Sequence, residues 1–173
     1  MLPMERALCR CAVPGYTNPG MKTLSSPTRI LLIGASGGLG SALAQHYARP
    51  GVRLWLWGRD LDRLQSVAQA CKAAGASTTI RSLDIADIPA ALQALSGEDD
   101  AAGFDLAIFA AGRGDIRPAG QKVEDAALVA HLGTVNFASP AAMAAMLAER
   151  MAARGGGSIV LVGSAAAFHA LPF

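Results

Sequence analysis

Short apolar runs alternate with longer stretches of helical periodicity from Thr28 onward. The apolar runs have the length of strands, and the stretches between them have the length and pattern of amphipathic helices. This alternation predicts an α/β fold, a doubly wound parallel sheet with helices on both faces in an α/β/α sandwich. Right-handed crossovers with one reversal give the expected strand order 3-2-1-4-5. The expected strands are 29–33, 52–57, 77–83, 104–110 and 158–162, and the expected helices are 39–48, 60–74, 87–95 and 123–153.

The segment before Thr28 shows no periodic pattern. Glycines and prolines lie close together in it, which favours a disordered leader over residues 1–27 and a single domain over residues 28–173. Met21 is an alternative start of the chain. Within the domain, the strands Val52 to Trp57 and Ile159 to Val162 are apolar on both faces, as are strands buried between two helical layers.

The most distinctive segment is Ile30 to Gly40, in which a branched apolar run breaks at Gly34 and glycine recurs at Gly37, Gly38 and Gly40. It predicts a strand, a tight turn and a helix whose N-terminal amides and positive dipole end face that turn, an arrangement that suits a diphosphate. Gly34 permits the turn, Gly37 or Gly38 exposes bare backbone to a ligand, and Gly40 lets helix and strand pack closely. The spacing fits both G-x-x-x-G-x-G and G-x-x-G-x-x-G, so the turn alone leaves the type of dinucleotide site open.

The composition limits the kinds of partner. The chain has 173 residues, is 52% hydrophobic and carries a formal charge of +2 that resides in residues 1–27. The neutral domain therefore offers no basic surface for nucleic acid or an anionic membrane. The absence of a signal peptide and of a membrane-spanning apolar run favours a cytoplasmic protein. The cysteines and histidines are too few and too scattered for a disulfide framework or a metal site: Cys9, Cys11, Cys71, His46, His131 and His169.

Several short motifs, taken together, resemble those of the short-chain dehydrogenase/reductase family. They are GASGGLG at 34–40, GRD at 58–60, LDIAD at 83–87, AAG at 110–112, VN at 135–136 and GGSIVLVGS at 156–164. The resemblance runs from residue 28 to the end of the sequence. It implies a Rossmann-type NAD(P)-binding domain of an enzyme that moves hydride between the nicotinamide and a small-molecule carbonyl or alcohol substrate. It also implies a homo-oligomer for a full-length form.

The end of the second expected strand indicates which coenzyme is bound. Gly58 stands where an acid would bind a ribose hydroxyl, and Arg59 follows it, suited to a 2′-phosphate. NADP(H) is therefore the expected cofactor, with NAD(H) as the alternative. Asp60 either binds the sugar or caps the helix that begins at Leu61, and Arg59 is otherwise an ordinary surface arginine.

The resemblance implies that Asp84, just after the third strand, contacts the adenine; the alternative is that Asp84 only forms a turn or caps a helix. At Ala110 to Gly112 this sequence has AAG where the family that it resembles usually has an asparagine-rich motif. This difference puts a hydrogen bond that braces the sheet in doubt, but the small residues leave room for the cofactor. The expected cofactor-binding residues are Gly34, Ser36, Gly38, Leu39, Gly40, Arg59, Asp84, Ala111 and Gly112.

Asn136 and Ser164 are the expected catalytic residues. Gly133 and Pro140 weaken the helix beside Asn136, and Pro140 has no N–H to donate to the Asn136 carbonyl. That carbonyl suits a water, and the resemblance implies that Asn136 holds one in a proton relay; the alternative is a kink alone. Ser164 follows the last strand, where the resemblance implies that its hydroxyl binds the substrate carbonyl and orients a tyrosine. Its alternative role is that of a capping or loop serine.

The family's tyrosine and lysine, spaced Tyr-x-x-x-Lys, are not found in the sequence, and the resemblance places them beyond Phe173. We therefore expect a truncated chain, the cofactor-binding N-terminal portion of an enzyme. Since general acid catalysis contributes roughly 10²- to 10⁴-fold, little activity is expected from this portion alone. A non-catalytic dinucleotide-binding or interaction module is the alternative function, and a decayed or frameshifted product is a third possibility.

Overall fold

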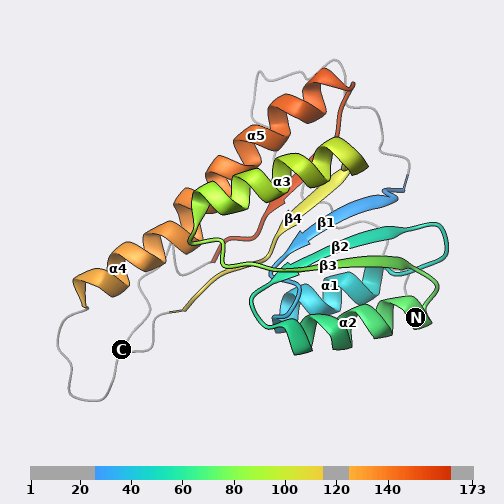
Figure 1. Cartoon of the computed structure of the whole chain (residues 1–173), viewed down its shortest axis with the longest axis horizontal. Helices are drawn as coiled ribbons and strands as arrows, with labels where there is room; N and C mark the ends of the chain where they lie inside the picture. Colours follow the sequence, from blue (N-terminus) through green and yellow to red (C-terminus); the bar gives the residue numbers. More distant parts are fainter. Residues whose placement is uncertain (1–25, 115–124, 165–173) are drawn as a thin grey trace, which may run out of the picture.

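A computed structural model describes residues 26–114 and 125–164 of the chain. It contains a five-stranded parallel sheet in the order β3-β2-β1-β4-β5, with helices on both of its faces (Figure 1). The predicted doubly wound α/β fold and its strand order are confirmed. The expected leader lies almost entirely outside the described residues, as does His169.

The strands lie close to their predicted positions, and β1 is the central one. Ile30 of β1 is paired with Leu54 of β2 and with Leu106 of β4, so the three strands end at the same edge. The strands are β1 Arg29–Ile33, β2 Arg53–Gly58, β3 Ser77–Ser82, β4 Leu106–Phe109 and β5 Ser158–Leu161.

The helices α1 and α2 cover one face of the sheet, and α3 and α5 cover the other (Figure 1). Three helices begin where an aspartate accepts a hydrogen bond from a first-turn amide: Asp60, Asp87 and Asp125 cap α2, α3 and α4 at 3.0, 3.1 and 3.0 Å. The helices are α1 Gly38–Tyr47, α2 Leu61–Ala73, α3 Ile88–Ala102, α4 Ala126–Gly133 and α5 Ser139–Ala153, with a π-helical turn, η1, at Thr134–Ala138.

The core consists of two layers because β1 is buried on both faces. Ile30 and Leu32 pack toward α1 and α2, whereas Leu31 and Ile33 pack toward α3 and α5. The expected burial of the strand Val52 to Trp57 is confirmed at four of its five apolar positions, because Val52, Leu54, Leu56 and Trp57 are at most 2% exposed, whereas Trp55 is only partly buried.

The expected burial of Ile159 to Val162 is wrong. Val160, Leu161 and Val162 are 43%, 56% and 43% exposed. The strand β5 lies at the edge of the sheet and is paired only with β4, and α5 is the helix that contacts it among the described elements. The sequence of β5 is apolar on both faces of the strand, but among the described elements only α5 covers it, on one face.

The predicted long helix is interrupted where Gly133 and Pro140 weaken it. The chain runs from α4 through the π-turn η1 into α5, and the Ser139 amide donates to the carbonyl of Thr134, five residues earlier. Asn136 lies inside this turn. π-Turns in α-helices occur often at functional sites, and in Figure 1 the α4 end of this helix extends away from the sheet.

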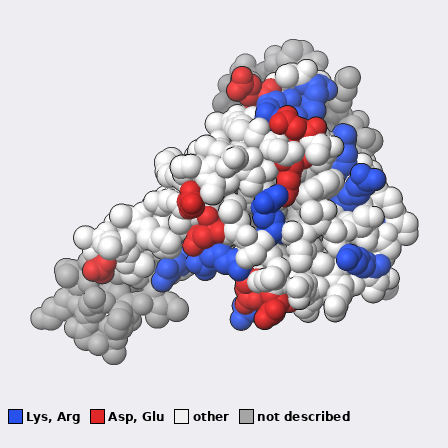
Figure 2. Space-filling view, in the orientation of Figure 1, with Lys and Arg blue, Asp and Glu red and all other residues white. Residues whose placement is uncertain are grey.

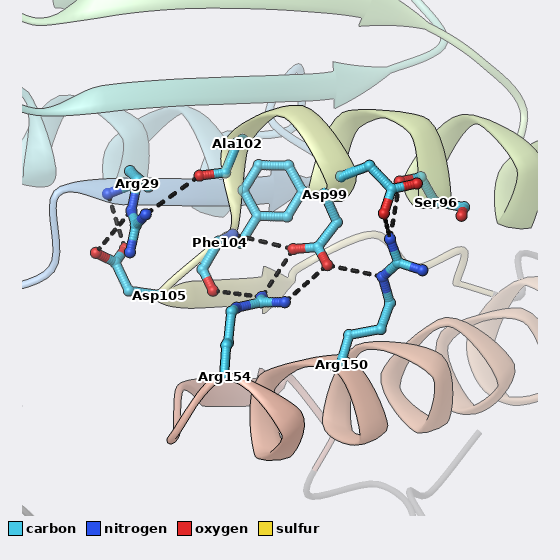
Figure 3. A network of polar contacts seen from close by, with 9 residues as sticks. Arg29, Ser96, Asp99, Ala102, Phe104, Asp105, Arg150 and Arg154 are labelled. Atoms are coloured by element: carbon cyan, nitrogen blue, oxygen red, sulfur yellow. Dashed lines mark hydrogen bonds and ion pairs between the residues drawn. The ribbon is translucent and has the colours of Figure 1, made fainter.

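The helix α3 is seven residues longer at its C-terminus than the expected 87–95, ending at Ala102 before Gly103, which has a φ of +61°. Its last turns carry Asp99, whose carboxylate lies between Arg150 of α5 and Arg154, the residue that follows α5 (Figure 3). The Asp99 side chain is 1% exposed. This cluster, Asp99 with Arg150 and Arg154, joins the two helices on that face.

Candidate functional site

A pocket of about 350 Å³ lies at the carboxyl ends of β1 to β4. Ligands bind at this edge in doubly wound sheets. Of the eleven residues expected to form the site, six line the pocket: Gly34, Ser36, Arg59, Asp84, Ala111 and Gly112. The other lining residues are Ile33, Gly37, Gly58, Asp60, Arg63, Leu83, Ile85, Ala110, Arg113 and Val135.

The glycine turn is held against the end of β2. The amides of Gly34 and Ala35 both donate to the carbonyl of Trp57, at 2.8 and 2.9 Å, and the Gly37 amide donates to the Gly34 carbonyl at 3.0 Å. Gly34 has a φ of +93°, and a Cβ there would lie 2.5 Å from the backbone nitrogen of Ala111. The backbone conformation and the close approach of Ala111 both require glycine.

The other glycines of the turn differ in their surroundings. A Cβ on Gly40 would overlap the Gly34 carbonyl, which explains the close packing of helix and strand predicted for this position. A Cβ on Gly38 would meet no described atom within 4 Å. Gly38, Leu39 and Gly40 do not line the pocket, although Gly38 and Leu39 are exposed in the first turn of α1 beside it.

The N-terminus of α1 differs from those of the capped helices α2, α3 and α4. Its N-cap is Gly37, no side chain caps its amides among the described residues, and its first turn has no acidic residue. Its first amides and its positive dipole end therefore remain available to an anion. Gly37 itself lines the pocket.

Charged side chains surround the pocket mouth. Arg63 pairs with Asp60 at 3.2 Å, while Arg59 Nη1 lies 3.9 Å from Asp84 Oδ2. The Arg59 and Asp84 side chains are 63% and 47% exposed, so their pair contributes little to stability, and Arg59 can turn toward a ligand. Figure 2 shows basic and acidic side chains together in the angle where the α4 end of the long helix meets the rest of the domain.

Asp60 and Asp84 have structural roles as well as a place at the pocket. Asp60 Oδ1 accepts from the Arg63 amide at 3.0 Å and caps α2, the alternative role weighed for it. Asp84 Oδ1 accepts from the Ala86 amide at 3.0 Å, which forms the turn between β3 and α3. Both carboxylates retain a second oxygen directed to an arginine.

Asn136 is an exposed residue next to the pocket residue Val135, and it fixes the segment that follows β4. Its Oδ1 accepts from the Arg113 amide at 2.8 Å, and its Nδ2 donates to the Arg113 carbonyl at 2.9 Å. Neither bond follows from the sequence pattern, which indicated only a weak point in the helix. Ser164 is an exposed residue three positions beyond the end of β5 and is not among the residues that line the pocket.

Two pocket arginines were not expected from the sequence. Arg113 directly follows the AAG motif at the end of β4, so the rule that placed Ala111 and Gly112 at this edge extends to it. Arg63 is one helical turn after Asp60 in α2. Together with Arg59 they place three cationic side chains around one pocket.

These residues fit a dinucleotide that carries phosphate groups. The uncapped amides of α1 suit a diphosphate, the absence of side chains at Gly34 and Gly112 leaves backbone accessible, and the arginines suit a further phosphate. A nicotinamide dinucleotide would supply the hydride-transfer chemistry when bound.

The family model of short chain dehydrogenases matches residues 28–173. The chain belongs to the short-chain dehydrogenase family. An uncharacterized oxidoreductase from Myxococcus xanthus (strain DK1622) is 34% identical over 142 residues, which are 82% of this chain and 55% of that protein. The chain therefore spans little more than half the length of this relative.

Solved structures agree with the family assignment. A short-chain dehydrogenase from Sphingobium yanoikuyae in complex with NADPH is 30% identical with a TM-score of 0.71, over 82% of this chain and 55% of that one. The bulky-bulky ketone specific alcohol dehydrogenase from Comamonas testosteroni is 27% identical with a TM-score of 0.73, over 84% and 58%. Among the described residues of this chain, no helix has the length and apolar character needed to cross a membrane.

Proposed function

We propose that the chain is the coenzyme-binding portion of an NADP(H)-preferring short-chain oxidoreductase that moves hydride between the nicotinamide and a small-molecule carbonyl or alcohol. The observation that carries the proposal is the pocket lined by the glycine turn and three arginines, with the uncapped N-terminus of α1 beside it. The Sphingobium relative with bound NADPH supports a phosphorylated nicotinamide coenzyme. We place the protein in the cytoplasm and expect the full-length form to be a homo-oligomer.

In this proposal each part of the pocket binds one part of the coenzyme. The amides of Gly38, Leu39 and Gly40 bind the diphosphate, Arg59 binds the 2′-phosphate, and Asp84 lies at the adenine. A charge pair about 4 Å apart contributes roughly 4 kcal/mol at an effective dielectric of 20, and the exposure of Arg59 reduces this to the order of 1 kcal/mol. That difference favours NADP(H), with NAD(H) as the weaker ligand.

Asn136 and Ser164 serve catalysis in the proposed enzyme. Asn136 positions the Arg113 segment through its two side-chain hydrogen bonds and holds a relay water at its carbonyl. Ser164 binds the carbonyl oxygen of the substrate. Because the printed sequence contains no Tyr-x-x-x-Lys, we propose that these 173 residues bind coenzyme but have little turnover by themselves.

Calorimetric titration with NADPH and NADH tests the proposal. We expect the chain to bind NADPH more tightly, and Arg59→Ala to weaken NADPH binding about fivefold, the equivalent of about 1 kcal/mol, while NADH affinity stays the same. Arg53→Ala is the matched control, because Arg53 is an exposed arginine at the opposite end of β2. Equal affinities for the two coenzymes, or no binding to well-folded protein, would refute the proposal.

A non-catalytic dinucleotide-binding module that acts through association is the second candidate. It is favoured by exposed apolar side chains on the long helix and at the sheet edge, with Phe137 75%, Val129 52% and Leu161 56% exposed. Both candidates bind coenzyme. The two candidates are separated by measuring NADPH oxidation by the full-length protein in the presence of a panel of carbonyl compounds. Turnover supports the enzyme, and coenzyme binding without turnover supports the module.

A further inference from the structure

The end of β2 is crowded on the side where a side chain at Gly58 would begin. A Cβ on Gly58 would lie 2.6 Å from Ser36 Oγ, 3.2 Å from Ser36 Cβ and 3.3 Å from Leu64 Cδ2. Real Cβ atoms essentially never approach another atom as closely as 2.6 Å. The space in which any side chain at position 58 would begin is therefore occupied by Ser36 of the glycine turn and Leu64 of α2.

This crowding cannot be relieved by a shift of the turn alone. The amides of Gly34 and Ala35 are bonded to the carbonyl of Trp57, the residue before Gly58, so the turn and the end of β2 are held together. Leu64 is fully buried in the core. Rotation of the half-buried Ser36 side chain would move its Oγ, but its Cβ would stay 3.2 Å from the new atom, so replacing Ser36 by glycine relieves more of the crowding than rotation does.

The charges near Gly58 are arranged around this excluded volume. Arg59 follows it directly, and Arg63 lies on the same pocket wall in the first turn of α2. A carboxylate at position 58 would lie at the same pocket as both arginines and compete with a ligand phosphate for them. Arg59 and Arg63 already face the carboxylates of Asp84 and Asp60, and glycine at position 58 adds no third carboxylate to them.

We propose that Ser36 is a coenzyme-specificity residue that acts through Gly58: its hydroxymethyl group excludes an acidic side chain from the end of β2 and so maintains a pocket for the 2′-phosphate. This inference rests on the proposed NADP(H) preference and deepens it. It makes a specific claim of coupling: conversion to an NAD(H)-preferring pocket requires a change at Ser36 together with one at Gly58.

A double-mutant cycle tests the contact without any ligand. Thermal unfolding is measured for the unchanged chain, Ser36→Gly, Gly58→Ala and the double variant. We expect Gly58→Ala to lower the melting temperature in the unchanged chain and to lower it much less when combined with Ser36→Gly, because that change removes the atoms 2.6 and 3.2 Å from the new methyl group. Equal losses in both backgrounds would overturn the inference. Gly97→Ala is the control, since a Cβ there meets nothing within 4 Å.

The same positions are then tested for specificity by titration with NADPH and NADH. We expect Ser36→Gly combined with Gly58→Asp to shift the ratio of affinities toward NADH by about tenfold or more relative to the unchanged chain. Gly58→Asp alone should be poorly stable or bind both coenzymes weakly. If it is as stable and as NADH-preferring as the double variant, Ser36 has no such role.

The outcomes separate this inference from the proposed function. An unchanged chain that binds neither coenzyme, or that prefers NADH, refutes the proposed function, and with it the role of Ser36 in specificity, whatever the unfolding cycle gives. An unchanged chain that prefers NADPH, with no coupling between positions 36 and 58, refutes the inference alone. If Gly58→Asp does not fold, the alanine cycle still decides whether the contact exists.

Discussion

Replacing Asp99 with asparagine should destabilise the protein strongly without touching the pocket. The carboxylate accepts from Arg150 Nε at 2.8 Å, from Arg154 Nη1 and Nη2 at 2.9 and 2.8 Å, and from the Phe104 amide at 3.0 Å. Asparagine keeps the size of the side chain and an acceptor for the Phe104 amide. It removes the negative charge that two guanidinium groups face (Figure 3).

The size of the effect follows from the burial of the cluster. Breaking a buried ion pair by removing one partner costs about 3–5 kcal/mol. We expect about 3 kcal/mol because the arginines are 27% and 29% exposed and keep other acceptors, with Arg154 bonded to the Phe104 carbonyl at 2.8 Å and Arg150 to Asp100. In a chain of this length, that corresponds to a fall of roughly 6–12 °C in the melting temperature.

Thermal and urea unfolding followed by circular dichroism measure this difference. Asp100→Asn is the matched control, because Asp100 is the next residue of α3, contacts the same Arg150 and is 68% exposed. We expect it to cost less than about 1 kcal/mol. Equal losses for the two variants, or a loss below about 1 kcal/mol for Asp99→Asn, would refute the view that burial makes the Asp99 cluster important.

The same cluster predicts a pH dependence. Burial raises the pKa of Asp99, but the hydrogen bonds from Arg150, Arg154 and the Phe104 amide outweigh it and hold the pKa below its ordinary value. Because the pKa of Asp99 is lower in the folded state, its contribution to the free energy of unfolding is complete at pH values above the ordinary carboxyl pKa of about 4. This contribution is lost as the pH falls through the folded-state pKa. The stability gap between the unchanged chain and Asp99→Asn should therefore be constant near neutral pH and shrink below about pH 4.

Three further outcomes are expected. Gly40→Ala should unfold at a clearly lower temperature, since its methyl group overlaps backbone, whereas Gly38→Ala, whose methyl group enters open space, should keep its stability and weaken NADPH binding. Cys71 is fully buried, and burial raises the pKa of its thiol, so peptide mapping after treatment with a thiol reagent should find it modified only in denaturant; labelling of the native chain would contradict this. Asn136→Ala should lower the free energy of unfolding by about 1 kcal/mol, through the two lost bonds to Arg113, and should weaken NADPH binding. Asn136→Asp keeps the acceptor, so its NADPH affinity should lie between those of the unchanged chain and Asn136→Ala. An unchanged coenzyme affinity in Asn136→Ala would exclude a positioning role.

Much of the fold was determined by local sequence. The apolar runs of β1, β2 and β4, the β-branched residues of β3 and the turn at Gly34 depend on residues close together in the chain, and the alternation of strands and helices sets the parallel sheet and its order. The placement of Asp84 and Gly112 at the carboxyl edge followed from the same alternation, since all parallel strands end at one edge. For these features, periodicity and glycine geometry were sufficient.

Other features were decided only by tertiary packing. The helix α3 is longer than the expected 87–95, and its extra turns are held by a contact that local sequence does not contain, since Asp99 is bonded to Arg150, 51 residues later in the chain. The exposure of β5 depends on its place at the sheet edge, and the crowding of Gly58 depends on a turn that lies beside it only in the folded chain. Local patterns specify which elements form, but ion pairs, edges and excluded volume arise between residues that only the folded structure brings together.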